Sequence, residues 1–311
     1  MTRKNKGEIE KPEVTFVCGV ELELEYDSDL LGGISLRSYH SNEASPFGNS
    51  FIAEEDGSLY PNTFRRGQTA EIISFPFEID EWRRVLTDFK NEVEKRVAET
   101  NSFFPEGERK DFSKLELKDV LSFNNTTGAH LHVSFLKRSK NKAKKYSVTY
   151  KGRHFVYDAE PFPIKKVGTL RFLMSIVRSV LKRVEVELPN VYPFFRKRFF
   201  RDHSRRNRTF CNNEERSLCW NFQDEKVEHL EFRSFNLSGV ETWADFFKMY
   251  EILFDELKKA FEKELSKREK FFERKRILIS DADFSEISVT DKIIVENVET
   301  KRSEKTIFLE G

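Results

Sequence analysis

Three segments far apart in the chain alternate apolar and polar residues in the same way. The segment 14–26 reads VTFVCGVELELEY, in which valine or leucine alternates with glutamate from position 20 onward. The segments 128–135 (GAHLHVSF) and 229–236 (HLEFRSFN) repeat this alternation, with histidine, glutamate and arginine as polar residues. Because successive side chains of a strand point to opposite faces, each segment predicts a strand with one apolar face and one polar face.

Helical spacing of apolar residues predicts three amphipathic helices. The first spans about 80–97, with Asp80 as its cap, and the second spans about 168–186. The third spans about 242–275, where the Thr-x-x-Asp pattern that begins at Thr242 supports the first turn.

The order of these elements predicts an α+β fold. A further strand, AEIISFPF, ends near Pro76, and strands and helices alternate irregularly. We therefore expect a largely antiparallel sheet with helices packed on one face and a functional site on the other. Changes in composition divide the chain into a flexible N-terminal lead (1–13), one large domain (14–275) and a small C-terminal β appendage (276–311). The appendage is predicted from its short β-branched runs, RILIS, IIVENV and TIFLEG.

Composition limits the class of protein without selecting a partner. The 311 residues include 31 phenylalanines, which excludes a disordered chain. The 54 basic and 53 acidic residues nearly cancel, so net charge gives no argument about nucleic acid. Cys18, Cys211 and Cys219 lack the spacing of metal ligands and indicate reduced thiols. Since no apolar run reaches membrane-spanning length and no signal-peptide pattern is present, we expect a cytoplasmic protein without membrane contact.

The polar faces of the predicted strands carry residues suited to a hard metal ion. Carboxylates and imidazoles are ligands that Mg²⁺ and Mn²⁺ accept, and an arginine beside them suits a polyphosphate. Taken singly, alternating glutamates more often mark a solvated sheet face, His-x-His a structural or accidental pair, and Glu-x-Arg a surface ion pair. Together the three strands favour a metal site. The chain has no P-loop, no GxGxxG after a strand, no HExxH and no CxxC. Any nucleotide site must therefore belong to a fold without a P-loop.

Five short motifs, in this order, resemble the amidoligase family of carboxylate–amine ligases related to glutamine synthetase and glutamate–cysteine ligase. They are GVELE (19–23), DGSL (56–59), EIIS (71–74), GAHLHV (128–133) and LEFR (230–233). The resemblance covers roughly residues 14–260. It implies a catalytic domain like that of glutamine synthetase, which binds ATP with Mg²⁺ or Mn²⁺ and joins a carboxylate to an amine through an acyl phosphate.

The resemblance also implies a role for particular residues. The implied metal ligands are Glu21, Glu23, Glu71, His130 and Glu231. His132 is implied on the nucleotide side, Arg233 as a phosphate contact, Arg216 as the arginine before the final catalytic strand and Asp56 as a substrate contact. The chain departs from the family pattern at Thr127, where Cys or Ser is usual, and in the long basic stretch 137–165.

Two basic segments keep other interpretations open. The segment 194–208, which contains Arg205, is a candidate to close over ATP or hold an acidic substrate, or is a solvated surface segment. Because phenylalanines lie between its basic residues, it also fits nucleic-acid contact, together with the lysine-rich segment 137–153. The alternatives to a ligase are a non-catalytic structural or nucleic-acid-binding protein with this fold, and a phosphotransfer enzyme such as a guanidino kinase.

Overall fold

The structure is a computed structural model. The chain consists of two compact units, Met1–Ala260 and Phe261–Gly311. It describes residues 14–38, 45–55, 59–109, 115–123, 128–138, 146–150, 153–157, 159–161, 170–197, 220–224, 227–232, 235 and 237–280. The predicted lead 1–13 therefore lies outside the described residues.

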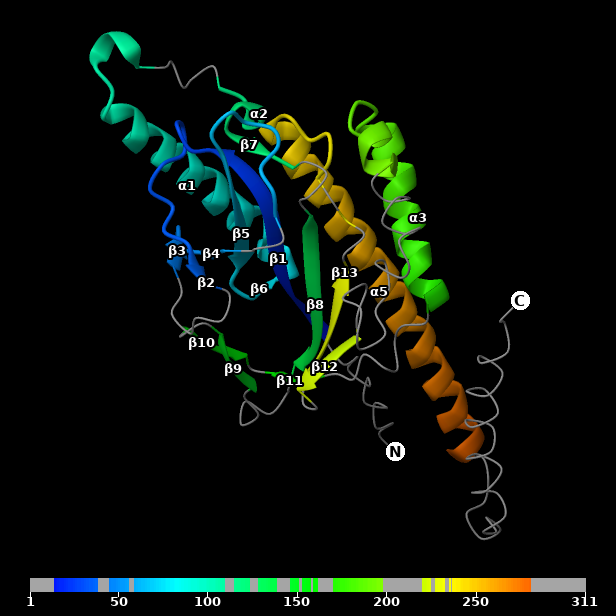
Figure 1. Ribbon diagram of the computed structural model, residues 1–311. Coiled ribbons are helices and arrows are strands. Elements are labelled where there is room, and N and C mark those ends of the chain that lie inside the picture. Colours follow the sequence, from blue (N-terminus) through cyan, green and yellow to red (C-terminus); the bar gives the residue numbers. More distant parts are fainter. Residues whose placement is uncertain are drawn as a thin grey trace, which may run out of the picture. The chain divides into compact units, whose positions relative to one another are not determined.

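An eleven-stranded sheet forms the centre of the first unit (Figure 1). Its longer strands are β1 (Val14–Asp27), β4 (Phe51–Glu55), β5 (Gly67–Ser74), β8 (Ala129–Arg138), β12 (Trp220–Asp224) and β13 (Val227–Phe232). Its short strands are β2 (Arg37–Ser38), β3 (Ser45–Phe47), β6 (Phe77–Glu78), β7 (Leu121–Ser122) and β11 (Ala159–Pro161).

The strands lie in the order β12-β13-β8-β1-β5-β4-β2, with the other short strands pairing beside this path. Among the described strands of this sheet, every pairing is antiparallel except that of β2 with β4. The sheet joins segments that are distant in sequence, since β8 lies between β1 and β13. The predicted α+β class with a largely antiparallel sheet is confirmed.

The helices are α1 (Trp82–Ser102), the short α2 (Leu117–Val120), α3 (Leu170–Glu187) and α5 (Trp243–Ser280), with 3-10 turns η1 (Ile79–Glu81) and η2 (Glu106–Glu108). Phe89 of α1 packs on Phe51 of β4 at 5.5 Å between ring centroids and on Phe246 of α5 at 5.8 Å. Phe51, Phe89 and Phe246 are all fully buried. The helices α1 and α5 therefore share one aromatic core with the apolar face of the sheet, which leaves the opposite face for polar chemistry (Figure 1).

Of the two predicted helix N-caps, the one at Thr242 is confirmed and the one at Asp80 is wrong. The backbone N–H of Asp245 donates to the hydroxyl of Thr242 at 3.1 Å, which confirms the cap of α5. The prediction for Asp80 is wrong, because Asp80 lies inside η1 and its carboxylate pairs with Lys258 of α5 at 2.7 Å. Glu78 holds the cap position of η1 instead, and its backbone N–H donates to the carboxylate of Glu81 at 3.3 Å.

The C-terminal prediction is wrong at its first run. Residues 276–280, RILIS, belong to α5 and not to a strand, because a short apolar run fits a helix as well as a strand and here it continues a long helix. Residues 281–311 lie outside the described residues, so the rest of the appendage stays a prediction.

A separate two-stranded hairpin follows β8 along the chain. Its strands are β9 (Tyr146–Tyr150) and β10 (Arg153–Tyr157), which pair antiparallel. Arg153 joins the hairpin to the main sheet, because its guanidinium donates to the carbonyl of Asn49 at 2.7 Å and lies 4.0 Å from the ring centroid of Phe75.

Two further predictions concern environment. None of the helices in the described residues is long and apolar enough to cross a membrane. Cys18 is buried and free, and its burial raises the pKa of the thiol, so that it stays protonated. Cys211 and Cys219 lie outside the described residues.

Candidate metal centre

Backbone register brings the three alternating segments together on one face of the sheet. Glu21 of β1 lies opposite His130 of β8, and Gly19 lies opposite His132. On the far side of β8, His132 lies opposite Glu231 of β13. Residues directly opposite each other in an antiparallel pair lie on the same face of the sheet. Positions 19, 21, 130, 132 and 231 therefore share one face by register. We call it the acidic face.

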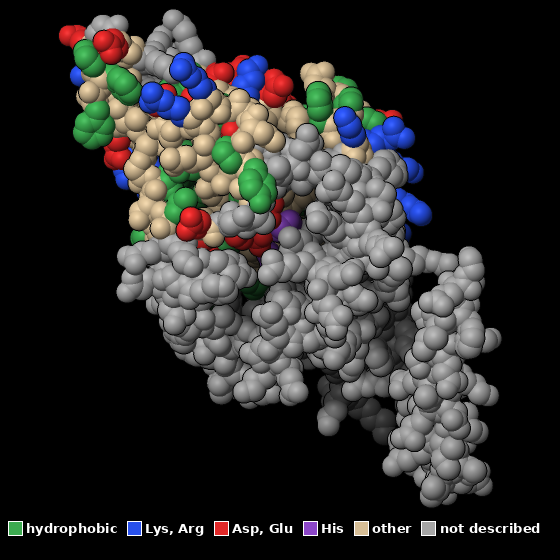
Figure 2. Space-filling model, in the orientation of Figure 1, with side chains coloured by type: hydrophobic (Ala, Val, Ile, Leu, Met, Phe, Trp, Pro, Cys, Tyr) green, Lys and Arg blue, Asp and Glu red, His purple; other side chains and the backbone are tan. Residues whose placement is uncertain are grey.

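A row of three glutamates crosses the neighbouring strands on the same face. Glu23 lies opposite Glu71 of β5, and Glu71 lies opposite Glu54 of β4. Glu71 is 5% exposed and Glu54 is 1% exposed. Figure 2 shows acidic and histidine side chains gathered together on one side of the molecule. Carboxylates buried on neighbouring strands carry a cost in free energy that bound or paired positive charge reduces.

Three side chains come close enough to hold one ion. Glu21, Glu23 and His130 each offer a ligand atom, and these atoms lie within 4.8 Å of one another. Two atoms bonded to opposite sides of one ion at roughly 2.1 Å are about 4.2 Å apart. The cluster is therefore within a small adjustment of a bonding arrangement.

His130 bridges the two glutamates of β1. Its Nδ1 lies 2.5 Å from Oε1 of Glu21, and its Nε2 lies 3.7 Å from Oε1 of Glu23. A carboxylate that accepts from Nδ1–H fixes the ring tautomer and leaves Nε2 to bind a metal, an arrangement common around metal-ligating histidines. Nε2 of His132 lies 3.1 Å from the second oxygen of Glu21. Glu21 thus orients both histidines.

The electrostatics of Glu21 follow from this geometry. Burial acts to raise the pKa of its carboxyl, but the charge and hydrogen bonds of His130 and His132 outweigh burial and hold the pKa well below its usual value. Glu21 is therefore ionised at neutral pH, as a metal site requires.

Gly128 leaves room between the candidate ligands. A Cβ on Gly128 would lie 2.8 Å from Oε2 of Glu23 and 2.9 Å from Nε2 of His130. The space above Gly128 is thus bounded by one carboxylate oxygen and one imidazole nitrogen. This donor pair and the missing side chain fit a bound divalent ion.

Glu25 shares the acidic face but has a different environment from Glu21 and Glu23. It lies opposite Thr69 of β5 and is fully buried. Both of its oxygens accept backbone N–H groups from the loop at 62–64. Burial acts to raise the pKa of Glu25, but these hydrogen bonds hold it below the usual value.

The structure places some of the predicted site residues and not others. It brings Glu21, Glu23, Glu71, His130 and His132 together, and places the backbone of Glu231 beside them in the sheet. The remaining predicted residues, Asp56, Arg205, Arg216 and Arg233, lie outside the described residues. In the basic segment, Phe195 is buried while Phe194 is exposed, so at least one of its phenylalanines belongs to the core.

Sequence analysis missed Glu54 and the loop contacts of Glu25. Glu54 ends the apolar run FIA, and a glutamate in a run buried on both faces is the signal that points to it. The partners of Glu25 are backbone groups 37 to 39 positions away, which no local pattern indicates.

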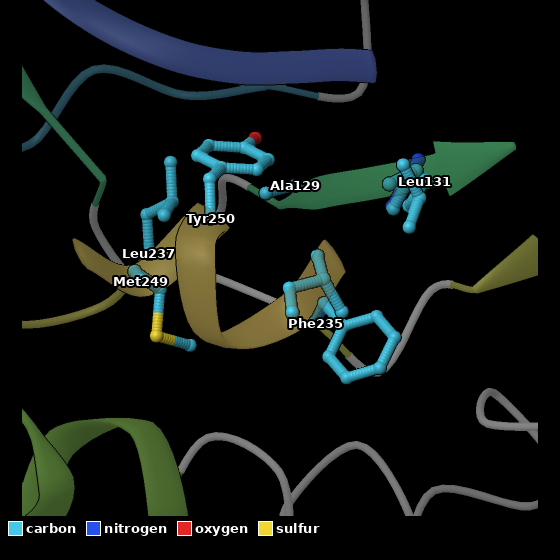
Figure 3. A pocket seen from close by; sticks show the side chains of 8 residues that line it. Ala129, Leu131, Phe235, Leu237, Met249 and Tyr250 are labelled. Atoms are coloured by element: carbon cyan, nitrogen blue, oxygen red, sulfur yellow. The ribbon is translucent and has the colours of Figure 1, made fainter. Parts of the chain in front are cut away.

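A small cavity lies on the opposite, apolar face of β8, next to α5 (Figure 3). Its volume is about 10 Å³, which is room for a single water molecule. Its lining includes Leu131, Leu237 and Met249, and His130 contributes as well. Tyr250 also lines it, and its hydroxyl is buried without a hydrogen-bond partner among the described residues. The cavity is too small and too apolar for a nucleotide, so the acidic face remains the candidate site.

The chain matches no protein-family model, and a search of the curated proteins finds no match.

Proposed function

We propose that this protein is an ATP-dependent carboxylate–amine ligase with a catalytic domain like that of glutamine synthetase. One observation carries the proposal: the sheet register aligns glutamates and histidines from four separate strands on one face, with Glu21, Glu23 and His130 close enough to hold one ion. The order of motifs along the chain supports the same family.

The chain's own residues would hold a divalent ion, Mg²⁺ or Mn²⁺, on the acidic face. Glu23 and Nε2 of His130 bound the space above Gly128, and Glu21 orients the His130 ring and contributes the third group of the cluster. Glu71 lies next to Glu23 and extends the negative charge along the row. When bound, the ion supplies the positive charge that neutralises a triphosphate.

The reaction that suits such a site has two steps. An oxygen of the substrate carboxylate attacks the γ-phosphorus of ATP, so that an acyl phosphate forms and ADP leaves. The amine nitrogen then attacks the acyl carbon, phosphate leaves, and the nitrogen loses a proton to give the amide. The acidic face positions the triphosphate for the first step, and no covalent bond to the protein is required.

Calorimetry tests the proposal at its first requirement. Wild-type protein is titrated with Mn²⁺, then with ATP in the presence of Mn²⁺ or EDTA, beside Glu23→Gln and Glu231→Ala. We expect ATP binding that needs the metal ion and is lost in Glu23→Gln, because that variant keeps the shape of a ligand but removes its charge. Amines and carboxylates of amino acids, polyamines and peptides are then screened for phosphate release.

A different pattern of binding would count against this function. ATP binding that is unaffected by EDTA and by both substitutions would place the nucleotide away from the acidic face. If wild-type protein binds neither Mn²⁺ nor ATP, the non-catalytic interpretation is favoured, and binding to RNA and DNA at several salt concentrations becomes the next measurement.

A further inference from the structure

We infer that Glu25 is a positioning residue, which holds the loop Tyr60–Arg66 as a wall at one end of the acidic face and binds no metal ion. The alternating pattern gives Glu21, Glu23 and Glu25 equal standing as ligands. Their contacts differ: Glu21 and Glu23 belong to the metal cluster, whereas Glu25 binds the backbone of a loop. This loop forms one border of the site.

The carboxylate of Glu25 is saturated by the loop. Its Oε1 accepts the backbone N–H groups of Thr63 and Phe64, each at 2.8 Å, and its Oε2 accepts those of Asn62 at 2.9 Å and Thr63 at 3.0 Å. A carboxylate offers about four lone-pair directions, and these four contacts occupy them. Both oxygens of Glu25 are therefore engaged by backbone N–H groups of the loop, which disfavours a metal ion at this carboxylate.

Three consecutive N–H groups that converge on one anion form a backbone nest. The carboxylate of Glu25, from β1, occupies this nest. The conformation of the loop therefore depends on Glu25. Gly67 makes the arrangement sterically feasible, because a Cβ at this position would lie 2.2 Å from Oε1 of Glu25.

Other contacts also anchor the loop. The carbonyl of Arg66 accepts the N–H of Ser28 at 3.1 Å, and the guanidinium of Arg66 pairs with Asp29 at 2.9 Å. The hydroxyl of Thr63 lies 3.0 Å from that of Ser122. The backbone N–H groups of residues 62–64 donate to Glu25, which lies one side-chain repeat from Glu23, about 7 Å along β1.

This location makes the loop a wall beside the metal cluster. The part of the inference that concerns a nucleotide rests on the proposed function: a loosened wall weakens binding of Mn²⁺–ATP while the cluster itself still binds Mn²⁺. A group with only a structural role would change neither affinity, and a metal ligand would change both.

Hydrogen exchange of the amides 62–64 is compared with Mn²⁺ and Mn²⁺–ATP affinity in wild type, Glu25→Gln and Gly67→Ala. Glu25→Gln replaces two acceptor directions by N–H groups, and Gly67→Ala displaces the carboxylate while leaving every charge in place. For both variants we expect exchange at 62–64 to accelerate about tenfold or more, because hydrogen bonds to a charged acceptor are lost. Exchange within α1 stays unchanged, Mn²⁺ affinity stays within about threefold, and Mn²⁺–ATP affinity falls.

Each contrary result overturns the inference in a recognisable way. Loss of Mn²⁺ binding in Glu25→Gln means that Glu25 is a ligand. Unchanged exchange at 62–64 in both variants means that the loop does not depend on Glu25, and faster exchange in α1 as well means general destabilisation. If wild-type protein binds no Mn²⁺, the proposed function fails, while the exchange comparison still decides whether Glu25 holds the loop.

Discussion

A methyl group placed on Gly128 tests the proposed metal site. Gly128→Ala changes no charge and removes no candidate ligand. The φ angle of Gly128 is not among the positive ones, so alanine fits the backbone there. The effect of the substitution therefore comes from the space that the new Cβ occupies.

The structure gives the size of that effect. The Cβ would lie 2.8 Å from Oε2 of Glu23 and 2.9 Å from Nε2 of His130, whereas ordinary contact begins at 3.4 Å. Each donor must therefore retreat by about half an ångström, which is the tolerance within which a binding constellation must be held. Since Mg²⁺ demands near-ideal bond lengths, we expect metal affinity to fall about 100-fold, or about 2.8 kcal/mol.

Gly19→Ala is the matched control. Gly19 is on the same face of β1, opposite His132, but its Cβ would meet only the Cβ of His132 at 3.7 Å and Oγ of Ser74 at 4.0 Å. This variant should bind Mn²⁺ within about threefold of wild type. Mn²⁺ affinity is measured by calorimetry and by the loss of free Mn²⁺ signal in electron paramagnetic resonance. Equal affinities for wild type and Gly128→Ala, with circular dichroism unchanged, would refute the placement of the ion above Gly128.

Three further predictions concern stability. Phe246→Ala should lower the free energy of unfolding by about 3–5 kcal/mol, measured by urea denaturation, because Phe246 is fully buried and contacts rings from α1 and α5; a loss below about 1 kcal/mol would contradict the shared aromatic core. Thr242→Ala should cost about 1 kcal/mol and Thr242→Ser much less, since only the hydroxyl caps α5, so equal losses would exclude the cap. Hydrogen bonds from Arg183 and Lys248 lower the pKa of Glu187 from 4.5 to about 2. Glu187 therefore contributes at most about 1 kcal/mol to the free energy of unfolding, because its site is partly exposed. This contribution is complete above pH 5 and is lost as the pH falls toward 2. Glu187→Gln should remove this pH dependence when the free energy of unfolding is measured from pH 5 to pH 2.

The elements of the fold were predictable where the local pattern and the tertiary environment agree. The apolar positions of 80–97 became the buried stripe of α1, with Val85, Leu86, Phe89, Val93 and Val97 all buried. Predictions were wrong where the local pattern was short or where the side chain makes a tertiary contact instead. The run RILIS has too few residues to distinguish strand from helix, and Asp80 forms an ion pair with Lys258 in place of the predicted cap.

The residue types of the candidate site and the strand faces that carry them were predictable from the sequence. The separate roles of the individual glutamates were not. Alternation alone assigns Glu21, Glu23 and Glu25 to one face, because the side-chain period of a strand is two. It gives no means of telling a candidate ligand from a loop anchor. That distinction depends on which backbone groups approach each carboxylate, and for Glu25 those groups come from residues 62–64.

The sequence by itself determined the faces of the strands, the apolar stripes of the helices and the ligand-type residues of the acidic face. Each of these follows from spacing within a few residues. Only the tertiary structure decided that β8 lies between β1 and β13, that Glu54 adjoins Glu71, and that Gly128 leaves space between Glu23 and His130. The reason is physical: strand order and register are set by hydrogen bonds and packing between segments distant along the chain, and a shift of one residue would carry the whole acidic set to the opposite face.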